Sequence, residues 1–111
     1  FRVLNTIAYG NATATLFPGT GGTLVVSNSC VSATNYITAG SGILTNDPQF
    51  VHATAGNFRL RATSPCVDQG LTLSWMADAT DLDGNVRVDR RGLVDMGCYE
   101  TLLRATLILL R

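Results

Sequence analysis

LNTI at residues 4–7 and SNSC at residues 27–30 are the stretches that decide the fold, because each carries an asparagine at the same place in a similar pattern. Both asparagines, Asn5 and Asn28, precede a small hydroxyl residue and then an apolar one. The step from position 5 to position 28 is typical of one coil of a parallel β-solenoid, which places equivalent side chains above one another about 4.8 Å apart. Stacked asparagines then hydrogen-bond along the axis as a ladder. The repeat therefore predicts that Asn5 lies over Asn28.

The sequence around the repeat is typical of strands and turns. FPGTGG at residues 17–22 is a loop pattern that leads into the β-branched stretch TLVV at residues 23–26. After Cys30, turns alternate with short extended pieces, and FRLR at residues 58–61 predicts a strand whose two arginines face outward. Only residues 71–79 favour a short helix.

Composition places the chain among small folded domains. The 111 residues are enough for one domain, and 46% hydrophobic with only 14% charged residues argues against disorder. The net charge of +0 gives no positive field to hold phosphates, so we expect no nucleic-acid partner. The run LILL at residues 107–110 is far shorter than the roughly 20 residues of a membrane span, so we expect none.

Five motifs in order carry a resemblance to a known family. They are NDPQFV at 46–51, GNFRL at 56–60, SPCVDQG at 64–70, TDLDGNVR at 80–87 and VDMGCYE at 94–100. Together they resemble the C-terminal end of the secreted bacterial right-handed parallel β-helix proteins of the pectin-lyase-like superfamily, in the group that finishes on an Asp-Ile-Gly-Ala-Tyr-Glu type motif. Cys98 stands where that motif usually has alanine.

The resemblance implies an all-β fold. We expect a short right-handed parallel β-helix fragment whose terminal coils and loop-rich cap span residues 1–100, followed by an extra apolar strand at 101–111. A small antiparallel β-sandwich is the alternative. Family enzymes carry their catalytic groups on middle coils, which this chain does not resemble, so no catalytic residue is transferred and a non-enzyme is favoured. The resemblance also implies an extracellular or cell-surface parent, although no signal peptide pattern precedes Phe1.

Asp78, Asp81 and Asp83 are the candidate metal ligands, since clustered carboxylates suit calcium. An EF-hand template with Gly84 at its sixth position fails at both outer ligands. The favoured interpretation is structural: the aspartates hydrogen-bond their own turn, and Arg87 pairs with one of them. No cofactor is expected, with calcium as the minor alternative.

Trp75, Arg59 and Arg61 are the candidate carbohydrate-binding residues, because an aromatic face and forked donors suit sugar acids. The competing interpretation is that Trp75 covers the end of the solenoid. His52 has no nucleophile motif beside it and is interpreted as a hydrogen-bonding residue. Glycosidase carboxylates among Asp89, Asp95 and Glu100 are a weaker possibility, since sequence does not fix their separation.

The three cysteines permit at most one internal disulfide. Cys30, Cys66 and Cys98 allow three pairings, and three buried thiols are an equal alternative. Their spacing does not match a zinc site.

The C-terminal tail alternates apolar and polar residues, which indicates a strand. Its leucines Leu103, Leu107 and Leu109 are the candidate dimer interface, either through the tail or through an open solenoid end. We therefore expect a non-catalytic structural or assembly module. A carbohydrate-binding module with a polysaccharide partner, or an inactive remnant of a polysaccharide lyase or glycoside hydrolase, are the alternatives.

Overall fold

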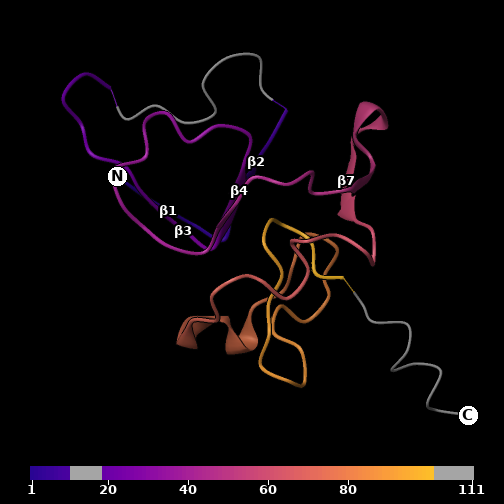
Figure 1. The fold of residues 1–111 in the computed structure, drawn as a ribbon. Helices are drawn as coiled ribbons and strands as arrows, with labels where there is room; N and C mark the ends of the chain where they lie inside the picture. Colours follow the sequence, from indigo (N-terminus) through magenta and orange to yellow (C-terminus); the bar gives the residue numbers. More distant parts are fainter. Residues whose placement is uncertain (11–18, 102–111) are drawn as a thin grey trace, which may run out of the picture.

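A computed structural model describes residues 1–10 and 19–101 of the chain (Figure 1). This part is sheet-rich, with only short 3₁₀ turns in place of helices, which confirms the expected non-helical class. The strands are β1 (Arg2–Leu4), β2 (Ile7–Ala8), β3 (Val25–Ser27), β4 (Ser29–Val31), β5 (Ile43–Leu44), β6 (Phe50–His52) and β7 (Asn57–Leu60). The turns are η1 (Ala53–Ala55) and η2 (Ser74–Asp78), and η2 lies within residues 71–79, where a short helix was expected.

We call residues 2–8, 25–31 and 39–44 the first, second and third pass of the chain. The first two passes pair in parallel, with the same separation along the chain between every residue and its partner. In β1 and β3, Val3 lies opposite Val26, and in β2 and β4, Ile7 lies opposite Cys30. In both pairs the step along the chain equals the step from Asn5 to Asn28. The two asparagines therefore occupy equivalent positions between paired strands, as the repeat predicted.

A third pass pairs with the second, and β5 joins the sheet of β2 and β4 with a shift that the asparagine repeat does not predict. Strand β5 pairs in parallel with β4, with Ser29 opposite Ile43, and a parallel bridge joins Val25 to Ala39. These two pairs share one step along the chain, which is shorter than the step between the first two passes. Strands β6 and β7 pair antiparallel, so the alternative of an antiparallel sandwich describes one hairpin and not the first three passes.

The core lies where these passes meet the loop-rich segment after residue 60, drawn in orange to yellow in Figure 1. Its buried cluster consists of Cys30, Leu60, Cys66 and Met96. The β7 stretch behaves as expected at Leu60, which is buried, whereas Phe58 is 48% exposed. Cys30 and Cys66 are buried free thiols, and Cys98 is an exposed one.

No helix among the described residues is long and apolar enough to cross a membrane. The dimer candidates Leu103, Leu107 and Leu109, together with almost all of the expected strand at 101–111, lie outside the described residues.

Candidate functional site

A corner of the chain recurs between the strands of each pass. Asn5, Asn28 and Gly42 stand at equivalent positions of the three passes, and all have positive φ, at 53°, 49° and 68°. Asparagine and glycine enter this left-handed region with the least steric strain. A Cβ atom on Gly42 would lie 3.1 Å from Nδ2 of Asn28, so the third corner packs closely on the second.

The corner asparagines bind the loop-rich residues 61–101, which we call the closing segment. Asn5 donates from Nδ2 to the Leu71 carbonyl at 2.8 Å and accepts from the Leu71 amide at 2.6 Å. Asn28 donates from Nδ2 to the Gln69 carbonyl at 3.5 Å. Instead of the predicted amide-to-amide ladder, both asparagines attach residues 69–71 to the paired strands.

Residues 94–97 contact both Gly70 and the first corner. Gly70 donates to the Val94 carbonyl at 2.9 Å, and Gly97 donates to the Asn5 carbonyl at 2.8 Å. A Cβ atom on Gly70 would lie 3.1 Å from Oδ1 of Asn5 and 3.0 Å from the carbonyl oxygens of Val94 and Asp95. The first corner is thereby held between two stretches from the C-terminal half.

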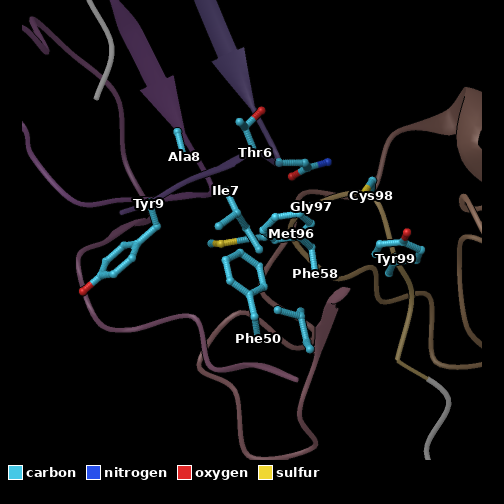
Figure 2. Close-up of a pocket in the computed structure, with 12 residues that line it drawn as sticks. Thr6, Ile7, Ala8, Tyr9, Phe50, Phe58, Met96, Gly97, Cys98 and Tyr99 are labelled. Atoms are coloured by element: carbon cyan, nitrogen blue, oxygen red, sulfur yellow. The ribbon is translucent and has the colours of Figure 1, made fainter. Parts of the chain in front are cut away.

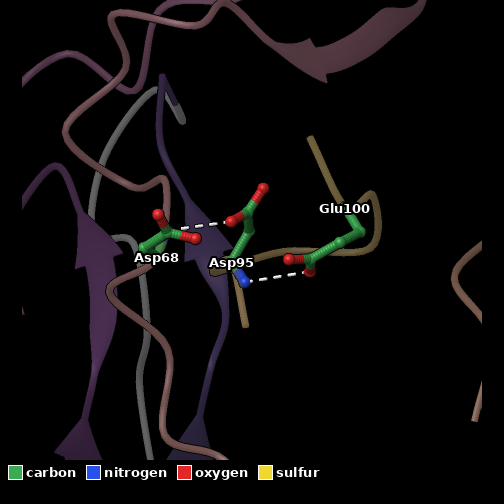
Figure 3. A group of neighbouring side chains, drawn as sticks. All are labelled: Asp68, Asp95 and Glu100. Carbon is green, nitrogen blue, oxygen red and sulfur yellow. Dashed lines mark hydrogen bonds between the residues drawn. The ribbon is translucent and has the colours of Figure 1, made fainter. Parts of the chain in front are cut away.

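Three carboxylates gather behind this contact: Asp68, Asp95 and Glu100, whose oxygens come within 4.8 Å of one another (Figure 3). Asp95 is fully buried, and it accepts hydrogen bonds from the amides of Asp68 at 2.8 Å and Thr101 at 2.6 Å. Glu100 accepts from the Asp95 amide at 3.0 Å. The carboxylates thus organise the backbone of the closing segment.

Two arginines contact the cluster. Arg87 donates from Nη2 to the carbonyls of Asp95 at 2.9 Å and Gly97 at 2.6 Å, and its Nη1 lies 3.8 Å from Glu100. Arg91 bridges Asp68 and Asp89 with bonds of 2.8 Å and 2.6 Å. The expectation that Arg87 pairs with an aspartate of the 81–83 turn is wrong, because this side chain is buried among the carbonyls and the carboxylate of residues 95–100.

Burial raises the pKa of both inner acids. Loss of solvent raises the pKa of Asp95, and it raises the pKa of Glu100 to about 8. Backbone hydrogen bonds oppose this change at both residues. Burial therefore favours the protonated form of Glu100, which lowers the negative charge of the cluster.

The cluster is close enough to surround a cation, and it differs from the predicted trio. Asp81 instead accepts from the amides of Asp83 at 2.9 Å, Asn85 at 2.8 Å and Glu100 at 2.6 Å. Asp83 forms a bidentate pair with Arg59 at 2.5 and 2.7 Å. The expectation of a carboxylate bonded to its own turn holds for Asp81, whereas Asp83 pairs with Arg59 of β7 instead. Asp78 lies at the end of η2, outside the acidic cluster.

An apolar cavity of about 480 Å³ opens between β2, the β6–β7 hairpin and residues 96–99. Figure 2 shows Ile7, Met96 and the Phe50 ring directed into it. The rings of Phe50 and Phe58 meet edge to face at 5.2 Å between centroids. This surface can accept apolar or aromatic groups.

The three carbohydrate candidates do not converge on one surface. Trp75 is 67% exposed beside a second cavity of about 300 Å³, which Asp81, Leu82 and Arg87 also line. Arg59 stacks over the Tyr99 ring at 4.5 Å, and Arg61 donates to the carbonyls of Phe50 and Val51. Neither arginine lines either cavity.

Sequence reasoning missed Asp68 and the corner contacts of Asn5. It named Asp95 and Glu100 only as a glycosidase pair, although both belong to the closing VDMGCYE motif. That motif was the available signal for the cluster. Comparisons with protein families, with curated proteins and with solved structures found no match.

Proposed function

We propose that this chain is a non-catalytic structural module from the C-terminal end of a parallel β-helix. In this proposal strands β1 to β5 belong to its last coils, and the closing segment covers them. The observation that carries the proposal is the parallel pairing of three successive passes, with Asn5, Asn28 and Gly42 in register.

The contacts of the closing segment support its role as a cap. A solenoid needs end segments that satisfy the exposed backbone and cover the core. Gly97 and Leu71 donate to the carbonyl and side chain of Asn5, and the buried acids and Arg87 fix residues 95–101 behind them. Polar groups in this segment are used for attachment to the coils and to each other, which favours a structural function over a catalytic one.

The unpaired edges of β1 and β2 in the described part of the chain support the proposal that these strands belong to the end of a longer stack of coils. Among the described residues, β1 pairs only with β3 and β2 only with β4, so each leaves one edge unpaired. In a solenoid, a preceding coil pairs with such an edge. From the resemblance of the five motifs, we also propose that the parent protein is extracellular or lies at the cell surface.

A tandem duplication of the first coil tests the proposal. A second copy of residues 1–23 placed directly before Phe1 has the observed repeat length, so it can pair with β1 and β2 in register. We expect a higher urea midpoint and slowed hydrogen exchange at the amides of β1 and β2. The control carries the same added segment in scrambled order. Equal midpoints for the two extensions would argue against a solenoid end.

A carbohydrate-binding module is the second candidate, and the exposed Trp75 beside a cavity is the observation that favours it. Aromatic faces stack on sugar rings. A glycan array of uronate and neutral polysaccharides tests it, with Trp75→Ala expected to lose any signal and Tyr36→Ala, another exposed aromatic, expected to keep it. An enzyme remnant gains no support, because Asp95 and Glu100 are buried and Asp89 pairs with Arg91.

A further inference from the structure

Two of the three cysteines meet inside the core although they come from distant parts of the chain. Cys30 lies in β4, opposite Ile7 of β2 and Leu44 of β5, while Cys66 lies in the closing segment. Both are fully buried and belong to one cluster with Leu60 and Met96. Each thiol also affects the other, since a hydrogen bond between them raises the pKa of Cys30 and lowers the pKa of Cys66.

Each cysteine is held in place by its surroundings. The Cys30 thiol also lies 3.1 Å from the Asn46 carbonyl. The Cys66 amide donates to Oγ of Ser64 at 3.1 Å, and its carbonyl accepts from the Met96 amide at 3.1 Å. Backbone positions on both sides are therefore fixed by hydrogen bonds, and both thiols belong to one buried cluster. Cys98 is exposed, so neither buried thiol reaches it without opening the core.

We propose that Cys30 and Cys66 form a disulfide that joins the β4 coil to the closing segment when the protein folds in an oxidising compartment. This selects one of the three pairings that the sequence leaves open and assigns Cys98 as the free thiol. The inference stands on the packing of the two thiols and does not require the parent protein to be a β-helix.

The oxidant in this proposal is a small-molecule disulfide such as oxidised glutathione. One cysteine thiolate attacks a glutathione sulfur, forming a mixed disulfide and releasing one glutathione thiolate. The second cysteine thiolate attacks the protein sulfur of that mixed disulfide, forms the Cys30–Cys66 bond and releases the second glutathione thiolate. The two protons lost by the cysteines are taken up by the released thiolates, so two protein thiols are oxidised and one glutathione disulfide is reduced.

The order of events follows from burial. Both thiols are fully buried in the folded chain, so the exchange takes place before the core closes. The finished bond is then shielded from reductants in the native state.

Peptide mapping tests the pairing directly. The chain is refolded in a glutathione redox buffer, its remaining thiols are alkylated in denaturant without reductant, and it is digested with trypsin. Cleavage after Arg2, Arg59, Arg61, Arg87 and Arg91 leaves the three cysteines on three separate peptides. We expect residues 3–59 joined to residues 62–87, with Cys98 alkylated. Three alkylated cysteines in the folded protein, or a link to Cys98, would overturn the proposal.

A stability comparison gives a second readout. Closing a loop of this length is expected to shift the unfolding equilibrium of the oxidised chain by roughly 30- to 1,000-fold over the reduced chain. Cys98→Ser should keep the whole difference, whereas Cys66→Ala should abolish it. Because Cys66→Ala leaves a core cavity and could fail to fold, the Cys98→Ser variant measured with and without reductant is decisive. Equal stability of its two forms would contradict the proposal.

Discussion

Asn5 combines a left-handed backbone with an amide group that makes two hydrogen bonds to Leu71. Asn28 has the same backbone conformation at the equivalent position, but it makes one long contact, at 3.5 Å, with Gln69. Glycine adopts this left-handed backbone conformation without steric strain, whereas alanine adopts it only at a cost in free energy. Substitution by these two residues therefore separates the backbone role of each corner from its hydrogen bonds.

We expect Asn5→Gly to lower the free energy of unfolding by about 1–3 kcal/mol, because two hydrogen bonds are lost while the backbone is accommodated. Asn5→Ala should cost roughly 1 kcal/mol more through strain at positive φ. At Asn28 the glycine variant should lie within about 0.5–1 kcal/mol of the parent, since only one long bond is lost. Urea denaturation measures all three variants. Equal losses for the two glycine variants would show that the contact with Leu71 does not hold the corner.

Glu100 makes stability depend on pH in a defined direction. Its pKa rises from 4.5 in the unfolded chain to about 8 in the folded protein, so the folded state keeps a proton that the unfolded state loses between these values. Its contribution is therefore fully present below pH 4.5 and is lost as pH rises through about 8. Asp95, whose pKa is also raised, acts in the same sense.

Glu100→Gln tests this behaviour, because a neutral amide of the same shape imitates the protonated acid. We expect unfolding midpoints of the parent to fall from pH 5 to pH 9 relative to the variant, with the two curves closest at the acid end. Urea denaturation at a series of pH values provides the comparison. A constant difference between the curves over this range would mean that Glu100 does not titrate as described.

At the scale of elements, the approach of one pass to the next is set by Gly40. A Cβ atom built there would lie 1.7 Å from the carbonyl oxygen of Val26, so no side chain fits between the β3 pass and the pass that follows. Gly84 also has positive φ, at +85°, but a Cβ atom there meets nothing within 4 Å. Both glycines have positive φ, but only at Gly40 does a neighbouring backbone leave no room for a side chain.

Gly40→Ala should therefore cost about 3 kcal/mol or more, because the clash separates paired backbones, and hydrogen exchange at Val26 and Asn28 should accelerate. The matched Gly84→Ala variant carries only the conformational strain and should cost about 1 kcal/mol. Chemical denaturation with amide exchange checks both. Similar stability of the two variants would contradict the close stacking of the passes.

The register between the first two passes could be predicted from the sequence, because the distance between two copies of a motif gives the repeat length. The step from Asn5 to Asn28 can be recognised from two similar sequence stretches. The shorter step to Gly42 cannot, because glycine replaces asparagine at that corner. The partners of the corner amides were also hidden. Leu71 is far from Asn5 in the sequence, and no local sequence pattern predicts a contact over such a separation.

The acidic cluster illustrates the same limit for the site. Asp78, Asp81 and Asp83 are close in sequence and were therefore predicted together, yet the turn and Arg59 use two of them separately. Asp68 joins Asp95 only because the two backbone stretches lie side by side through hydrogen bonds. The sequence indicated that carboxylates gather in this part of the chain. Long-range hydrogen bonds between backbone stretches determine which of the carboxylates lie together.

At the scale of the whole molecule, the balance of charge in the cluster bears on metal binding. Calcium requires six to eight oxygen ligands, whereas here Arg87 and Arg91 already face two of the carboxylates and backbone amides bind two. We expect the thermal midpoint to be the same in millimolar Ca²⁺ as in a chelator. A rise in calcium that disappears in Asp68→Asn would instead identify the cluster as a cation site.

The central claim is that successive passes of the chain lie in parallel register with Asn5 and Asn28 at one corner. Solution NMR tests it most directly through contacts between backbone protons of neighbouring strands. The parallel register predicts contacts that link Val3 with Val26 and Cys30 with Leu44, in the pattern of parallel pairing. Contacts between these segments in an antiparallel pattern, or their absence from a folded chain, would contradict it.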